Sequence, residues 1–390
     1  MKKIFLKFHL WLSVPFGIIV TLICFSGAML VFEPEAVKLL RHDVLYVDRP
    51  QHTALPIKSL VRSVEQTLPE DVRVTGVTMY ADPEMACKVN LSKPRRAAVY
   101  VDQYTGEVKG QYERPAFFET MQRLHRWLLD NRDDSGGVFW GRTVVGISTI
   151  VFVLVLLSGV VIWWPKTRRM LRNSLKITAS KGRHLLWRGL HVAGGMYVLL
   201  LLLVMALTGL TWSFQWYSKG FYALFGVSEV PKSGAVAYAE QQAEDAAKAK
   251  DKTGKGGKAT DVYAEWQTVY DTLRARNVNF DNITVSDGTA EVAFGGLGNQ
   301  RAADKYTFDK STGSITSASP YADSARSSKL RGWIMSVHMH VGRCAHALAV
   351  VRRRPVWRHA APYGLLSVDT PPAPPCAMMM SWMAQTGRMY

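Results

Sequence analysis

Three long apolar runs without a charged residue set the main constraint on the fold of this chain. They occupy residues 10–32, 143–164 and 192–216, and each reaches the roughly 20 residues that an α-helix needs to cross a bilayer. A buried core helix is one alternative for such a run, and a cleaved signal peptide is another for the first. A signal peptide has an apolar region of only about 7–15 residues and ends at a small-residue site, whereas the first run leads into Glu33-Pro34-Glu35. We therefore expect three retained membrane spans.

The formal net charge of +17 is largely explained by basic segments next to these runs. The N-terminus carries Lys2, Lys3 and Lys7. The segment 165–190 contains no acidic residue, and its basic residues are Lys166, Arg168, Arg169, Arg172, Lys176, Lys181, Arg183 and Arg188. Short basic segments beside spans stay in the cytoplasm, so we expect a multi-pass protein whose N-terminus is cytoplasmic and whose regions after the first and third runs lie outside. The charge then indicates topology and contact with the lipid bilayer, and it does not indicate a nucleic-acid partner.

The sequence indicates an internal repeat with two copies of one unit. The unit consists of a histidine followed by a span and a soluble region. The first unit has His9 and residues 33–138, and the second has His191 and residues 217–337. Each soluble region opens with a predicted amphipathic helix and continues with short alternating runs that are typical of strands. The helices are expected at residues 57–68 and 261–277. We interpret the polar insertion at 231–260 as flexible or loosely helical, without chemistry of its own.

Two matching turns support this duplication. Asp102 to Gly106 and Asp309 to Gly313 share the pattern D-x-x-T-G, and each lies between two predicted strands. In such a turn the Asp side chain accepts a backbone hydrogen bond, and Gly adopts the positive φ that closes a hairpin. One such motif indicates only a hairpin, but two at matching places indicate a duplicated domain. The predicted fold is a membrane α-helical bundle with two duplicated α+β domains.

Other motifs that carry chemistry do not occur in the sequence. Cys24, Cys87, Cys344 and Cys376 form no C-x-x-C pair, which argues against a zinc site and against a disulfide framework. No nucleotide-binding glycine loop, H-E-x-x-H or G-x-S-x-G motif is present, so neither a nucleotide site nor peptidase chemistry is indicated. A redox function would therefore need an external electron donor.

Several motifs resemble those of one membrane-protein family. They are FHLWLSVPFG and SGAML in the first span, RLHRWLL before the second, SGVVIWWPK at its end, LHVAGGMYVLL and ALTGLTWSF in the third, and HVGR at residues 340–343. In these motifs the chain resembles the PepSY-associated transmembrane family of bacterial inner-membrane proteins, which are often iron-regulated or similar to siderophore reductases. The resemblance covers about residues 1–343, and SGVVIWWPK together with the duplicated domain is its most specific part.

This resemblance implies a location in the bacterial inner (plasma) membrane, PepSY-like domains in the periplasm, and at least four spans. It also implies one or two b-type haems, a ferric siderophore as electron acceptor, and an electron donor such as quinol or a flavoprotein. Lys93, Arg95, Arg96 and Arg114 are candidates for attracting an anionic chelate. A solvated basic surface is the simpler explanation of each of them.

Four histidines fit the haem ligands that the resemblance implies. On the topology above, His9 and His191 lie at the cytoplasmic ends of the first and third spans, and His125 and His340 lie on the periplasmic side. Two imidazoles on facing helices can ligate one haem iron, so two pairs would place a haem near each face of a membrane core about 30 Å thick. His338 and His340 are two apart and so point to different sides of a helix; the resemblance of HVGR at residues 340–343 to the family motif favours His340, with His338 as the substitute. A histidine beside an interfacial tryptophan is also explained as a simple anchor.

Residues 344–390 depart from the family pattern. The family calls for a fourth apolar span after Arg343, but the longest apolar stretch there, 344–351, is too short to cross a bilayer, and three arginines follow it. We interpret this tail as the product of a reading frame that changes near residue 343 or 344. The fourth span is then lost.

Three functions remain open from the sequence. The one we favour is a haem-containing reductase that passes electrons across the inner membrane to a ferric siderophore in iron acquisition. The second is a non-redox membrane protein whose PepSY-like domains bind or regulate periplasmic peptides or peptidases. The third is an accessory subunit of an iron-uptake transporter. Only the reductase requires the paired histidines.

Overall fold

The computed structural model describes residues 2–351, apart from 52, 95–96, 132–138, 178–181, 229, 231–261, 295–298 and 300; for 262 and 340–351 it describes the backbone alone. The predicted insertion at 231–260 and the tail beyond 351 lie outside the described residues. The chain divides into two compact units. We call them the helical unit (Met1–Thr21, Gly146–Leu210 and Ser336–Tyr390) and the sheet unit (Leu22–Val145 and Thr211–Met335).

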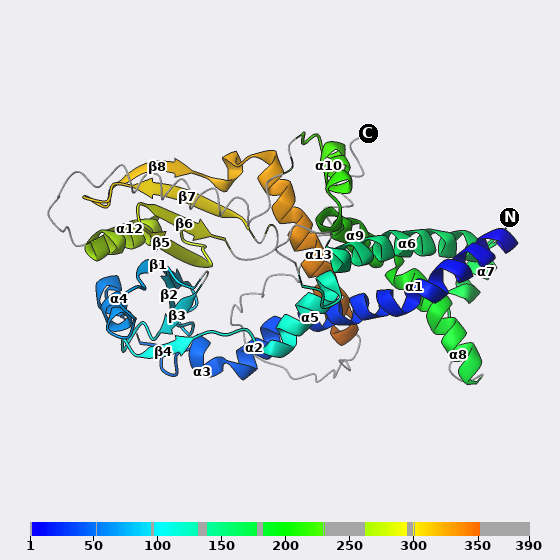
Figure 1. The fold of residues 1–390 in the computed structure, drawn as a ribbon, viewed down its shortest axis with the longest axis horizontal. Helices are drawn as coiled ribbons and strands as arrows, with labels where there is room; N and C mark the ends of the chain where they lie inside the picture. Colours follow the sequence, from blue (N-terminus) through cyan, green and yellow to red (C-terminus); the bar gives the residue numbers. More distant parts are fainter. Residues whose placement is uncertain are drawn as a thin grey trace, which may run out of the picture. The chain divides into compact units, whose positions relative to one another are not determined.

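Within the part of the chain that the structure describes, three helices are long and apolar enough to cross a membrane, as the sequence predicts. They are α1 (Lys2–Val31), α6 (Trp140–Trp163), and a third that joins α8 (Arg183–Gly189), a π-helical turn η1 (Leu190–Gly194) and α9 (Gly195–Ser213), as labelled in part in Figure 1. Helix α1 begins before residue 10, where the predicted span starts. The lysines and apolar residues that precede residue 10 are compatible with a helix. Helix α9 ends before the predicted residue 216, because Phe214 adopts an extended conformation.

The basic segment 165–190 is partly helical and is held to the spans by side-chain hydrogen bonds. Trp163 Nε1 donates to Ser174 Oγ over 3.1 Å, at the end of α7 (Arg168–Ser174). The hydroxyl of Tyr197 donates to the carbonyl of Leu175 over 2.9 Å. Residues of α6 and α9 therefore fix the middle of the segment.

One antiparallel sheet forms the centre of the sheet unit, with its strands in the order β4-β3-β2-β1-β5-β6-β7-β8, which can be followed in Figure 1. The strands are β1 (Val74–Tyr80), β2 (Cys87–Leu91), β3 (Ala98–Val101), β4 (Val108–Gln111), β5 (Asn282–Ser286), β6 (Thr289–Ala293), β7 (Ala303–Phe308) and β8 (Ile315–Ser319). The sequence predicts two small domains, and in the structure their strands pair through β1 and β5, with Val77 opposite Val285. The two soluble regions are thus one folded body.

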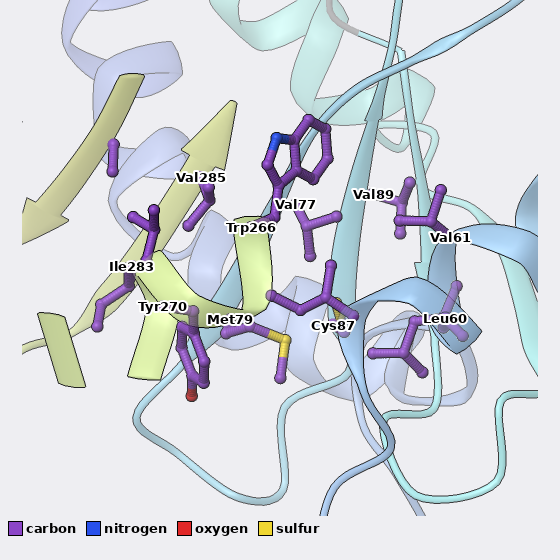
Figure 2. Close-up of a cluster of buried hydrophobic side chains, with 14 of the residues drawn as sticks. Leu60, Val61, Val77, Met79, Cys87, Val89, Trp266, Tyr270, Ile283 and Val285 are labelled. Carbon is purple, nitrogen blue, oxygen red and sulfur yellow. The ribbon is translucent and has the colours of Figure 1, made fainter. Parts of the chain in front are cut away.

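A shared apolar core lies between the sheet and two helices, α4 (Ile57–Glu65) and α12 (Val262–Arg276). Leu60 of α4 and Trp266 of α12 are buried against strand residues such as Val285, and Figure 2 shows these side chains converging from both halves. Full burial of a large apolar side chain stabilises a fold by about 1.5–3 kcal/mol. The core therefore couples the two halves energetically.

The two predicted hairpin turns are confirmed. Asp102 Oδ1 accepts a hydrogen bond over 2.8 Å from the backbone N–H two residues further on, and Asp309 Oδ1 does the same over 2.7 Å. The closing residues Gly106 and Gly313 have φ angles of +76° and +68°. A side chain with a β-carbon would be strained at both glycines.

The remaining helical segments are α2 (Glu33–Leu40), α3 (His42–Leu45), α5 (Ala116–Trp127), α10 (Gln215–Leu224), the 3-10 turn η2 (Tyr321–Asp323) and α13 (Arg326–Val351). Helix α13 begins inside the predicted soluble region 217–337 and carries both His338 and His340. It also continues past residue 344, so the first residues of the predicted tail are helical in their backbone.

Candidate functional site

His9 and His191 come together in the helical unit. His9 lies on α1, and His191 lies in η1, where the chain leaves α-helical geometry; π-helical turns are frequent at functional sites. Their ring centres are 6.3 Å apart, and the ring planes are inclined at 73°. Two imidazoles on opposite sides of one metal ion, with metal–nitrogen bonds of about 2 Å, have ring centres roughly 6 Å apart. The observed separation fits that arrangement.

A hydroxyl of α6 orients the His9 ring. His9 Nδ1 lies 2.9 Å from Ser158 Oγ, and Ser158 Oγ donates its one hydrogen to the carbonyl of Val155 over 2.9 Å. The Ser158 hydroxyl therefore accepts from His9, so that Nδ1 carries the proton and Nε2 keeps the lone pair. Metal-binding histidines almost always donate through their other ring nitrogen in this way.

A backbone carbonyl orients His125 in the same sense. His125 lies on α5, and its Nδ1 is 2.8 Å from the carbonyl oxygen of Ile23 on α1. Since a carbonyl only accepts, Nδ1 is the donor. Burial lowers the pKa of His125 and the charge of Arg126 adds to this, while the hydrogen bond to Ile23 partly opposes it. The ring is therefore neutral at pH 7, which is the form of histidine that binds metal ions.

His338 on α13 makes a third contact of this kind. Its Nδ1 is 3.1 Å from Thr208 Oγ1 of α9, and that hydroxyl donates to the carbonyl of Val204 over 2.7 Å. By the same argument Thr208 accepts from His338. The sequence favours His340 as the ligand, with His338 as its substitute. The side chain of His340 lies outside the described residues, whereas His338 has the surroundings that His9 has.

A glycine lies beside each of these three rings. A β-carbon built on Gly27 would lie 2.8 Å from Cε1 of His125. A β-carbon on Gly159 would lie 3.5 Å from Cε1 of His9, and a β-carbon on Gly209 would lie 3.4 Å from Cε1 of His338. In each case a buried Ser or Thr directly precedes the glycine. Each span therefore brings a hydroxyl–glycine pair to one histidine.

The helices that carry His9 and His191 also carry glycines with open space beside them. Gly194 and Gly195 follow His191 by three and four residues. A β-carbon on either of them, or on Gly17 of α1, would meet no atom within 4 Å. Among the described residues, no three His, Cys, Asp or Glu side chains gather, so these side chains alone form no metal cage. A porphyrin brings its remaining iron ligands with it, and two imidazoles at the observed separation fit a haem.

Two of the basic residues suggested for chelate binding have structural contacts. Arg114 forms an ion pair with Glu33 and a hydrogen bond to Gln122. Lys93 lies 3.6 Å from Asp71 at the surface. Residues 95–96 lie outside the described residues. Arg114 thus fastens the start of α2 to the segment that leads into α5.

The histidines can be identified from the sequence, but the residues that orient them do not stand out in it. Ser158, Thr208 and Gly27 are the main ones. A signal for them exists, because a Ser-Gly or Thr-Gly pair recurs once per span, in SGAML, SGVVIWWPK and ALTGL. A single hydroxyl in an apolar helix has many ordinary explanations, so the recurrence carries the information.

The comparison with known families agrees with these motifs. A family model described as the PepSY-associated TM region matches residues 6–349. The chain belongs to this family. No curated protein matches the chain closely. As a PepSY-associated protein with three membrane-spanning helices, the chain is an integral membrane protein, and its antiparallel sheet fits PepSY-like domains.

Proposed function

We propose that this PepSY-associated protein is a haem-containing inner-membrane reductase that passes electrons across the membrane to a ferric siderophore. The observation that carries the proposal is the approach of His9 and His191, whose ring centres are 6.3 Å apart. In the proposal these two residues ligate one haem b near the cytoplasmic face. When bound, haem supplies a one-electron couple between ferric and ferrous iron.

His125 and His338 are each proposed as a haem ligand on the periplasmic side. His338 takes the role that the sequence analysis gave first to His340, because Thr208 holds its Nδ1. The protein's own contribution is to fix these two rings through Nδ1 and to keep Nε2 available as a ligand. In this proposal the N-terminus is cytoplasmic, the sheet unit is periplasmic and presents the ferric chelate, and quinol or a flavoprotein supplies the electrons.

An optical spectrum of the full chain, purified in detergent from haem-replete cells, tests the proposal. We expect a low-spin b-type spectrum that sharpens on reduction with dithionite. His9→Ala and His191→Ala are expected to remove the same portion of the signal, since they share one iron. His125→Ala and His338→Ala are expected to leave that portion in place and to remove any second one.

His42→Ala is the matched control. The His42 ring stacks on Tyr46 with centres 4.8 Å apart, in α3 of the sheet unit, and it has no place in the proposed ligand set. Its replacement is expected to leave the spectrum unchanged. A colourless protein, or an equal loss of signal in the His42 variant, would contradict the reductase proposal for this chain.

A further inference from the structure

We propose that the hydroxyl–glycine pairs are positioning sites, built into the spans, that fix the tautomer and the orientation of the ligand imidazoles. Ser158 with Gly159 would position His9, and Thr208 with Gly209 would position His338. For His125 the acceptor is the Ile23 carbonyl, and Gly27 lies beside the ring. The role of these sites in haem binding rests on the proposed function, whereas their effect on the imidazole tautomer can be tested without haem.

The three sites share the same arrangement of groups around the histidine ring. In each one His Nδ1 meets an oxygen on the neighbouring helix, at 2.9 Å for His9, 2.8 Å for His125 and 3.1 Å for His338. In each one the glycine that follows the Ser or Thr faces Cε1, the carbon between the two ring nitrogens. The oxygen fixes the ring through one nitrogen, and the glycine allows the ring edge to approach the helix.

Ser26 fits this pattern although it does not touch His125 directly. Its Oγ donates to the carbonyl of Leu22 over 2.6 Å and lies 3.1 Å from the carbonyl of Ile23, and the Ile23 carbonyl is the one that accepts from His125. Ser26 is completely buried, so its hydroxyl acts within the same small network. The hydroxyls of Ser158 and Thr208 thus contact the ring nitrogen directly, whereas that of Ser26 lies against the carbonyl that accepts from the ring.

Such an acceptor has a chemical effect on a ligand. A hydrogen bond from Nδ1–H makes the imidazole a stronger electron donor through Nε2, which stabilises the ferric state of a bound haem relative to the ferrous state. Loss of a partner of this kind weakens metal binding by about 10–100-fold. A hydroxyl with a purely structural role would not change a reduction potential, so the potential separates the two explanations.

The experiment compares Ser158→Ala with Ser158→Thr in the full chain. We expect Ser158→Ala to weaken haem binding by at least about tenfold and to raise the midpoint potential, whereas Ser158→Thr keeps the hydroxyl and restores both. Ser148→Ala is the matched control, because Ser148 lies on the same helix, is completely buried and has a hydroxyl that finds no hydrogen-bond partner among the described residues. If Ser158→Ala behaves like Ser148→Ala in both measurements, the inference is wrong.

A second readout does not need haem. In ¹⁵N-histidine-labelled protein freed of haem, the His9 signal, assigned with His9→Ala, should show the Nδ1–H tautomer. Ser158→Ala should shift it towards a mixture of tautomers, and Thr208→Val should do the same for His338. If the wild-type protein holds no haem, the reductase proposal fails, and this measurement still decides the inference: an unchanged His9 signal in Ser158→Ala overturns it.

Discussion

Gly27 lies so close to His125 that a β-carbon on residue 27 would be 2.8 Å from Cε1 and 3.0 Å from Nδ1 of the ring. Carbon atoms in ordinary contact are about 3.5–4.0 Å apart. The spaces beside Gly159 and Gly209 are wider, with 3.5 Å and 3.4 Å to the nearest ring atom. Of the three positions, the one beside His125 therefore requires glycine most strictly.

Gly27→Ala should destabilise the protein and displace the His125 ring. Overpacking of this kind costs about 1–3 kcal/mol, and the shift would break the 2.8 Å hydrogen bond to Ile23. Gly159→Ala and Gly209→Ala should cost much less, since alanine also favours a helix over glycine by about 1 kcal/mol. Thermal unfolding of the three variants in detergent checks this order. Equal effects at all three positions would show that the close approach at Gly27 does not matter.

Gly76 is expected to be required for the pairing of β1 with β5, which is the joint between the two halves of the sheet. A β-carbon there would lie 2.5 Å from Ser286 Oγ and 2.8 Å from the carbonyl oxygen of Val285, and the latter is backbone that pairs β5 with β1. Gly76→Val should therefore open this ladder and destabilise the sheet unit by about 1–3 kcal/mol. Because one core serves both halves, amide hydrogen exchange should become faster on both sides of the joint.

Thr75→Ala is the control for the joint. Thr75 is exposed, and its hydroxyl only donates to the carbonyl of Asn90 over 3.2 Å. Exposed substitutions of this kind change stability by about 0.5 kcal/mol or less. If Gly76→Val speeds exchange only in the strands from β1 to β4, the halves unfold independently and the shared core does not couple them.

The buried thiol of Cys87 predicts a loss of stability at alkaline pH. Burial raises the pKa of Cys87 to about 12, from an ordinary value of 9.0. The unfolded chain ionises this thiol above pH 9 while the folded chain keeps it protonated, so its contribution is complete below pH 9 and is lost as the pH rises towards 12. At pH 11 the loss attributable to this residue is about 2–3 kcal/mol.

Cys87→Val removes the ionisable group and keeps a small apolar side chain in β2. The variant should lose less stability than the wild-type chain between pH 9 and pH 11, in urea unfolding followed by hydrogen exchange of the strand peptides. Tyr80 remains in both chains, and burial raises its pKa as well, so some alkaline dependence should persist. Identical pH profiles would mean that Cys87 is accessible in the folded protein.

The elements that the sequence predicts well are those specified locally. The three spans follow from length and hydropathy, and the turns at Asp102 and Asp309 follow from residues that act within a few positions of each other. The pairing of Gly76 with Ser286 joins residues that are far apart in the sequence. Alternating apolar residues show that strands exist, but they do not show which strands pair at the centre of a sheet.

The candidate site likewise has a part that local sequence patterns predict and a part that they do not. The repeated pattern and the family resemblance bring out His9 and His191, but they say little about the groups that hold the rings, which are single hydroxyls and carbonyls on other helices. The choice between His338 and His340 depends on which side of α13 faces Thr208. Residues two apart on an α-helix point in directions about 200° apart, and no local pattern shows which of the two directions faces Thr208.

His191 leads to a prediction about the gene. Among the described residues no hydrogen bond holds its ring, whereas His9 at the start of the first span is held by Ser158 near the end of the second. If the chain is a repeat, the equivalent partner of His191 lies near the end of a fourth span. The sequence analysis places the loss of that span at a frame change near residue 343 or 344.

Resequencing the gene and translating the other two frames beyond codon 343 checks this directly. One of them should encode an apolar segment of about 20 residues, with a Ser-Gly or Thr-Gly pair in its second half. In the frame-corrected chain, replacement of that Ser or Thr by alanine should weaken haem binding through His191 by about 10–100-fold, as Ser158→Ala does through His9. An apolar segment without such a pair would show that His191 is positioned differently from His9, and the absence of any apolar segment would show that the tail is native.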